Sequence, residues 1–269
     1  MGAARTLVKA TAAAVDTVRR PPAGLVVLIY HRVGRRTPIE IDLPLSAFAE
    51  QMAFLAAHST VVSLAEGLAR VADPSSPREP LVAITFDDGT ADFADVALPV
   101  LVEHHLPVTL YVATDFLEQG RQFPNDGTPI TWAALADAHS TGLVTVGSHT
   151  HAHALLDRLP SAELAGELDR SIELIEARIG VRPAHFAYPK AVAGSPAAES
   201  AVRGRFLSAA IAGTRVNRYG ATDPFRLARS PIQVSDGMRW FRHKVHGGMA
   251  AEDTLRRLVT RRRYTNSVS

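Results

Sequence analysis

The sequence contains no cysteine. This absence excludes disulfide bonds and thiolate metal sites, so any metal ion would have to be held by histidine and carboxylate side chains. Long apolar runs are missing as well, and the longest one, 25–30, is far too short to span a bilayer. Asp16 interrupts the alanine-rich start of the chain, which argues against a secretory signal. We therefore expect a cytoplasmic protein.

The chain has almost no excess of one charge, with a formal net charge of +2 over 269 residues. The exception is an arginine cluster at 256–263, which no aromatic residues accompany. This composition favours a solvated helix or tail over a nucleic-acid site, with at most a peripheral membrane contact through the basic ends. We expect a helical lead at 1–22, a single catalytic domain at 23–250 and a basic helix or tail at 251–269.

Short apolar segments alternate with helical patterns along the chain. The expected strands are 24–30, 81–86, 107–113, 143–148, a segment ending near 188, 207–211 and 227–234. The expected helices are 45–57, 92–104, 132–139, 155–179 with a break at Pro160, and 196–203, whereas 116–129 is typical of a loop. This alternation predicts an α/β fold, a distorted and closed or nearly closed β/α barrel of about seven parallel strands. An open doubly wound sheet is the alternative.

Two adjacent carboxylates, Asp87 and Asp88, follow the apolar strand 81–86 directly, with Gly89 after them. Adjacent carboxylates repel each other near an apolar strand unless a cation compensates them. The carboxyl ends of parallel strands meet at one mouth of a barrel, so the ligands for such a cation should follow other strands.

Three histidines follow the strand 143–148: His149, His151 and His153. Residues four apart share one side of a helical turn, which favours His149 and His153 as metal ligands, with His151 pointing elsewhere. Two imidazoles and one carboxylate suit a divalent ion, with zinc favoured over cobalt, manganese or iron. The alternative is a surface histidine cluster. A metal site of this kind supports hydrolysis, in which one aspartate binds the ion and its neighbour takes a proton from water. His31, at the end of the first strand, is the candidate acid.

The segments Thr85-Phe86-Asp87-Asp88-Gly89 and Ser148-His149-Thr150-His151-Ala152-His153 resemble the first two motifs of the polysaccharide deacetylases, carbohydrate esterase family 4. The resemblance extends over about 24–234 and implies a distorted β/α barrel. It also implies that Asp87 is the base and that Asp88, His149 and His153 bind the metal.

The chain departs from the family pattern after the strand near 186, where Ala187-Tyr188-Pro189-Lys190 replaces Arg-Pro-Pro-Tyr. This form is similar to the branch that includes the poly-N-acetylglucosamine deacetylases, whose motif order is circularly permuted. On that resemblance His31 supplies the acid, with His246 as the competing candidate. Tyr188 and Pro189 would then bind substrate or orient the base. Arg229 either replaces the missing base-orienting arginine or is a plain surface residue.

These features together predict a metal-dependent hydrolase. Its expected reaction is the removal of an N-acyl group, acetyl foremost, from an amino sugar of a cell-envelope polysaccharide, glycolipid or precursor. An N-acylated glycan is therefore the expected partner. The alternatives are an amidohydrolase acting on a ureide or formamide, and a barrel that binds a glycan without turnover.

Overall fold

The structure is a computed structural model that describes residues 9–12 and 21–252 of the 269-residue chain. Most of the expected lead at 1–22 and nearly all of the expected tail at 251–269, with its arginine cluster, lie outside the described residues. The domain boundaries therefore stay predictions. No helix in the described ranges is long and apolar enough to cross a membrane.

Seven parallel strands close into a barrel. Each of these seven strands pairs with the next of the seven along the chain, and the last pairs with the first. The ring therefore has no open edge. The strands are β1 (Gly24–Tyr30), β5 (Leu81–Phe86), β6 (Val108–Val112), β7 (Val144–Ser148), β8 (His185–Ala187), β9 (Ser208–Ala212) and β11 (Leu227–Pro231). The predicted seven-stranded barrel is confirmed as a closed one, and the open sheet is excluded.

Four short strands of the described ranges lie outside the ring. β4 (Thr60–Val61) pairs in parallel with the start of β5, and β10 (Asn217–Arg218) pairs antiparallel with the start of β1. β2 (Arg32–Val33) and β3 (Asp42–Leu43) form a separate two-stranded sheet immediately after β1. This small sheet lies at the end of the barrel where the strands finish.

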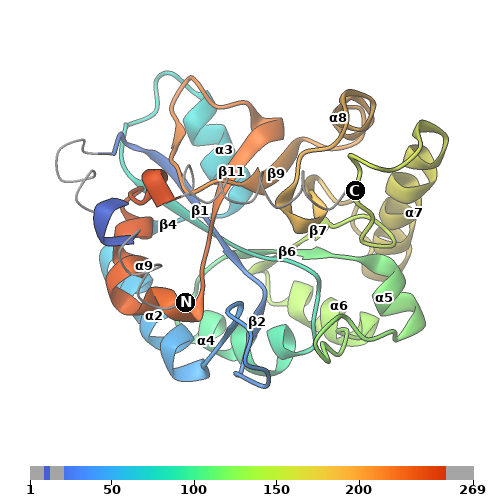
Figure 1. Ribbon diagram of the computed structural model, residues 1–269, viewed down its shortest axis with the longest axis horizontal. Coiled ribbons are helices and arrows are strands. Elements are labelled where there is room, and N and C mark those ends of the chain that lie inside the picture. Colours follow the sequence, from blue (N-terminus) through green and yellow to red (C-terminus); the bar gives the residue numbers. More distant parts are fainter. Residues whose placement is uncertain (1–8, 13–20, 253–269) are drawn as a thin grey trace, which may run out of the picture.

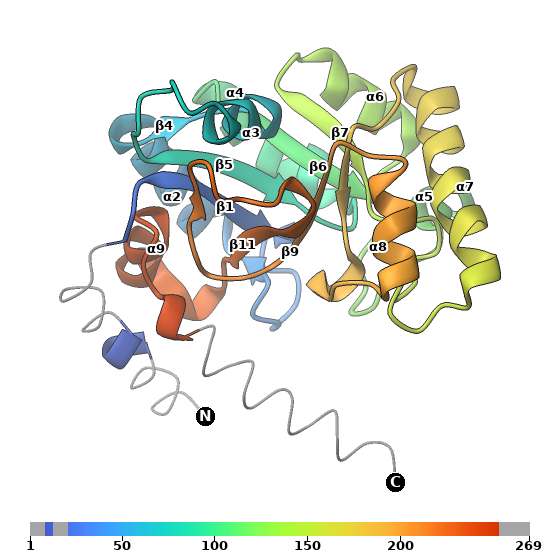
Figure 2. The same ribbon diagram turned by 90° about the horizontal axis from the view of Figure 1, so that it is seen from above.

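Helices surround the strands (Figures 1 and 2). They are α2 (Leu45–His58), α3 (Leu64–Ala72), α4 (Leu98–Glu103), α5 (Thr114–Gln119), α6 (Trp132–Ser140), α7 (Ser161–Ile179), α8 (Pro196–Arg203) and α9 (Gly237–Val245). The chain also forms a π-helical turn, η1 (Phe93–Ala97), and three 3-10 turns, η2 (Pro189–Ala191), η3 (Pro224–Arg226) and η4 (Val234–Asp236).

The strand residues divide between two apolar layers. Along β5, Val82, Ile84 and Phe86 pack outward against the surrounding helices, while Leu81 and Ala83 face the lumen. This alternation follows from the period of two of a β-strand. The lumen cluster also includes apolar residues of α3, which covers the end where the strands begin. The buried lumen leaves the opposite mouth as the place where polar groups meet.

The structure corrects two of the predicted elements and adds a helix. The helix α3 was not predicted, and 116–119 of the expected loop belongs to the helix α5. Residues 155–160 are not helical, because α7 begins only at Ser161, after Pro160. Pro99 comes after the π-helical turn and lies in the first turn of α4, where a missing N–H is tolerated.

Candidate metal centre

Asp87 and Asp88 lie at the carboxyl end of β5 and face different ways. Asp87 continues the inward face of Thr85, because side chains alternate along the strand. The chain then turns through positive φ angles of 73° at Asp88 and 89° at Gly89. A Cβ atom at position 89 would come within 2.9 Å of the Val112 side chain. Glycine therefore makes the tight turn that lets two neighbouring carboxylates serve different partners.

Arg229, on β11, forms a bidentate ion pair with Asp87. Its Nη1 donates to Asp87 Oδ1 at 2.6 Å and its Nη2 donates to Oδ2 at 2.8 Å, while Nη1 also reaches the Thr85 hydroxyl at 3.2 Å. Arg229 is 0% exposed, so it is not a surface arginine. Burial raises the pKa of Asp87, but the charge and hydrogen bonds of Arg229, together with the neighbouring histidines, outweigh this effect and leave the pKa below its usual value. Asp87 is therefore ionised at neutral pH.

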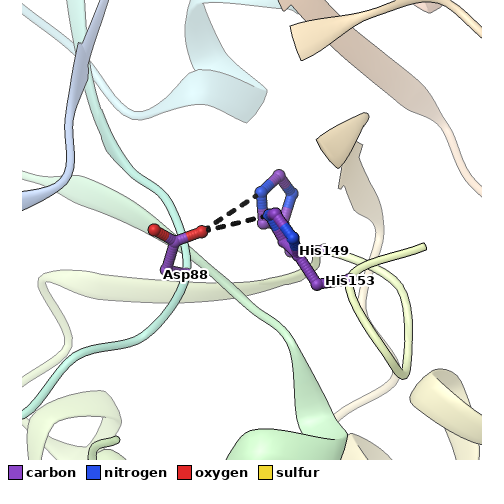
Figure 3. Close-up of side chains that lie close together, drawn as sticks. All are labelled: Asp88, His149 and His153. Carbon is purple, nitrogen blue, oxygen red and sulfur yellow. Dashed lines mark ion pairs between the residues drawn. The ribbon is translucent and has the colours of Figure 1, made fainter. Parts of the chain in front are cut away.

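Asp88, His149 and His153 form a compact set of ligand atoms. The Nε2 atoms of His149 and His153 lie 3.6 and 3.4 Å from the same oxygen of Asp88, as Figure 3 shows. One ligand atom from each residue lies within 4.8 Å of the others. These distances and the N, N, O donor set fit a single divalent ion with open positions.

The histidine ligands reach this geometry from a loop. Residues 149–153 form no helical turn, and φ is positive at Thr150 and at His153. The predicted pair of ligands is brought together, but the predicted helical turn is wrong. His149 Nδ1 contacts the Ala187 carbonyl oxygen at 2.7 Å, which requires the proton on Nδ1 and leaves Nε2 free as a ligand. Burial lowers the pKa of His149 to about 4, so the ring is neutral, as a metal ligand must be.

His151 points away from this set of ligand atoms. Its Nδ1 lies 2.9 Å from the Thr114 hydroxyl, and its Nε2 lies 3.8 Å from Asp115. Both partners belong to α5. His151 therefore supports the position of the loop rather than the ligand set.

The structure brings only one of the two candidate acids to the carboxylates. His31 follows β1 directly and lies close enough for its charge to act on both Asp87 and Asp88. Its Nδ1 is buried and has no hydrogen-bond partner among the described residues. His246 follows the end of α9 and is exposed, in a surface hollow lined by other residues of α9. His246 is not brought to the site.

The Tyr188 ring is not brought to the site either. It is 1% exposed and packs outward, in the apolar cluster between the barrel and helices α7 and α8. Pro189 follows it as the first residue of η2 at the end of β8, and its contact with substrate stays a prediction.

Tyr111 was not expected at the site. Its ring faces the Arg229 guanidinium, with Cζ 5.2 Å from the ring centroid. Its position on the inward face of β6 is the sequence feature that could have placed Tyr111 near the site.

The comparisons with known proteins agree with this geometry. Residues 75–203 match the family model of the polysaccharide deacetylases. The resemblance to the polysaccharide deacetylases is confirmed. Among curated proteins, the uncharacterized protein YlxY of Bacillus subtilis (strain 168) is 24% identical over 115 residues, which is 42% of this chain and 32% of that protein. The chain therefore matches about a third of that relative's length.

Solved structures share the barrel. IcaB from Ammonifex degensii is 24% identical, with a TM-score of 0.74, and the match covers 84% of this chain and 98% of that one. The deacetylase PplD of Streptococcus pyogenes is 19% identical, with a TM-score of 0.74 and coverages of 83% and 99%. A de-N-acetylase from Aggregatibacter actinomycetemcomitans is 21% identical, with a TM-score of 0.68 and coverages of 82% and 99%. These likenesses establish a common fold.

Proposed function

We propose that this protein is a metal-dependent N-deacetylase that acts on an amino sugar of a cell-envelope polysaccharide, glycolipid or precursor. The observation that carries the proposal is the position of the ionised, arginine-bound Asp87 beside the ligand set of Asp88, His149 and His153. The match to the polysaccharide deacetylase family over 75–203 supports the reaction class and the type of substrate.

Asp88, His149 and His153 would hold one divalent ion, with zinc favoured over cobalt, manganese or iron. When bound, such an ion polarises the acyl oxygen and lowers the pKa of a nearby water molecule. The protein's own part is to keep His149 neutral and Asp88 ionised. Burial raises the pKa of Asp88, but the contact with His153 and the charges of the neighbouring imidazoles outweigh it and bring the pKa well below its usual value.

Asp87 acts as the base in this proposal. The two hydrogen bonds from Arg229 keep the carboxylate ionised and fix its plane. Asp87 takes a proton from the water that attacks the acyl carbon. His31 then protonates the leaving nitrogen, since an amide anion leaves poorly. Base and acid catalysis each contribute about 10²- to 10⁴-fold in rate.

The test measures acetate release from N-acetylglucosamine oligosaccharides by the full-length chain, first stripped with a chelator and then reloaded with zinc, cobalt or manganese. We expect activity to disappear on stripping and to return with the metal. Metal-loaded Asp87→Asn should lose about 10²- to 10⁴-fold in kcat while it keeps the metal. His153→Ala should lose the metal as well. Asp95→Asn, at an exposed carboxylate on η1, serves as the control and should match the parent.

Three results would contradict the proposal in different ways. A metal-loaded Asp87→Asn variant as fast as the parent would remove the mechanism. Hydrolysis of a ureide or formamide in place of the N-acetyl sugar would move the site to another substrate class. Calorimetric binding of the oligosaccharide without acetate release would indicate a glycan-binding barrel.

A further inference from the structure

The segment that carries His31 is hydrogen-bonded to the segment that carries the two aspartates. The backbone N–H of Asp87 donates to the Tyr30 carbonyl at 3.0 Å, which continues the pairing of β1 with β5. Beyond that point the strands separate. The side chain of Asp92 then accepts a hydrogen bond from the Val33 backbone N–H at 2.7 Å. The Thr90 hydroxyl adds a longer contact to the His31 carbonyl, at 3.5 Å.

The Asp92 carboxylate accepts a hydrogen bond from β2 on the side where no other described strand pairs with it. On one side of β2, the N–H groups of Arg32 and Gly34 donate to carbonyl groups next to or within β3, at 3.2 and 2.7 Å. Successive N–H groups of a strand point in opposite directions, so the Val33 N–H points to the other side. There Asp92 Oδ2 is its acceptor. Val33 is 0% exposed, so this N–H would otherwise be a buried donor without an acceptor.

The burial of Asp92 is unfavourable by itself. The residue is 4% exposed, and burial raises the pKa of its carboxyl group above the usual value, although the Val33 N–H and the charge of Arg32 oppose the shift. A buried carboxyl group in a protein is tolerated where its hydrogen bonds compensate for the lost water. The hydrogen bond to Val33 is therefore the interaction that ties Asp92 to the end of β1.

We propose that Asp92 is a positioning residue that sets where His31 stands relative to Asp87 and Asp88. This inference rests on the proposed function, in which His31 is the acid. Asp92 touches no reacting atom. It holds the backbone two residues after His31, from the same short segment that carries the base and the metal-binding carboxylate. A misplacement of about 1 Å in such an arrangement lowers the rate by as much as about 10²-fold.

The role of Asp92 can be separated from that of the base by the choice of leaving group. An amine leaves an N-acetyl sugar only when it is protonated, so amide hydrolysis needs the acid. A 4-nitrophenolate leaves 4-nitrophenyl acetate without protonation, so ester hydrolysis needs the metal and the base but not the acid. Misplacement of His31 should therefore slow the amide reaction and spare the ester reaction.

The experiment uses the full-length, zinc-loaded chain and compares kcat for tri-N-acetylchitotriose with kcat for 4-nitrophenyl acetate. We expect Asp92→Ala to slow the amide reaction about 10- to 100-fold, to change the ester reaction less than about threefold, and thus to copy the selectivity of His31→Ala. Asp92→Asn keeps an acceptor oxygen for Val33 and should recover most of the amide rate. Asp42→Ala is the matched control, because Asp42 is 1% exposed and accepts the backbone N–H groups of Arg35 and Thr37. Asp42→Ala should show no such selectivity.

Each contrary outcome has one meaning. An equal loss on both substrates, or no loss on either, in a folded and zinc-loaded Asp92→Ala variant overturns the positioning role. If Asp92→Ala does not fold, Asp92→Asn decides the question: a residual loss confined to the amide reaction supports the role, and an equal loss on both substrates, or no loss on either, overturns it. If His31→Ala itself shows no selectivity, His31 is not the acid and the inference fails with that assignment. The deacetylase proposal would still stand on the loss of both activities in Asp87→Asn.

Discussion

Two buried carboxylates, Asp87 and Asp236, are both neutralised by cations but differ in what they leave free. At Asp87, Arg229 binds both oxygens from one side. At Asp236, two ammonium groups divide the oxygens between them, since Lys9 contacts Oδ1 and Lys244 contacts Oδ2, each at 2.7 Å. A carboxylate held from one side keeps a face for chemistry, whereas one surrounded by cations serves as a structural link.

The surroundings of the two carboxylates agree with this difference. Asp236 Oδ2 also accepts the backbone N–H of Gln233 at 2.8 Å, so the group joins residues 9–12, the turn η4 and the helix α9. Figure 2 shows the short helical piece 9–12 beside α9. Asp87 instead has His149 Nε2 at 4.0 Å from Oδ2, which is too long for a hydrogen bond. This side of Asp87 faces the ligand set.

The largest effect is expected on removing the partner of Asp87. In Arg229→Met the burial of Asp87 loses its main opposing charge, so the pKa of Asp87 rises and this proposed base is protonated over more of the pH range. We expect kcat/KM to fall about 10²- to 10⁴-fold, as for loss of the base itself. Arg229→Lys should fall between Met and the parent, because an ammonium cannot bind both oxygens in one plane. Steady-state kinetics with the metal content measured in parallel checks this order.

Arg205 supplies the matched control for Arg229. It also forms a bidentate pair, with Asp169 at 2.6 and 2.8 Å, but on the partly exposed outer surface. Arg205→Met should change stability by at most about 1 kcal/mol and leave the kinetics unchanged. Equal kinetic losses in the two variants would contradict the assigned difference between them.

The second effect is on stability and is expected at Asp236. In Asp236→Asn, two buried ammonium groups lose their counter-charge, which should lower the free energy of unfolding by about 3–5 kcal/mol. The kcat of the folded fraction should stay the same, since this group does not face the ligand set. Urea unfolding and active-site titration measure the two quantities. A variant of parental stability with reduced kcat would reverse the proposed division between structure and chemistry.

The smallest effect is the pH dependence of the same link. Burial raises the pKa of Asp236, but the charges of Lys244 and Lys9 outweigh it and lower the net pKa. A carboxyl group with a lowered folded-state pKa stabilises the fold above its unfolded value of about 4, and this stabilisation is lost as the pH falls toward the folded value. Unfolding experiments between pH 7 and pH 3 should show a decline below about pH 4 that is weaker in Asp236→Asn. An identical decline in the variant would contradict the link.

Much of the barrel and the membership of the ligand set could be predicted, because strand ends are visible in the sequence. Apolar segments ending in His31, Asp87 and His149 give the strand positions, and parallel pairing brings their carboxyl ends to one mouth. The loop geometry could not be predicted, since residues other than glycine seldom adopt the positive φ angles found at Asp88, Thr150 and His153. A spacing of four residues therefore indicated the two histidines that lie beside Asp88, although a loop and not a helical turn brings them together.

The sequence by itself determined which residues could meet. It has two neighbouring carboxylates followed by a glycine, histidines that come directly after other strands, and no cysteine that could compete for a metal. Only the tertiary structure decided what each one touches. It turned Tyr188 outward into the helix layer and placed Arg229 in the lumen against Asp87. It also surrounded Asp236 with two lysines. The physical reason is that side-chain direction and burial depend on the register and closure of strands far apart in the chain. The register and closure of these strands are not encoded in any local sequence pattern.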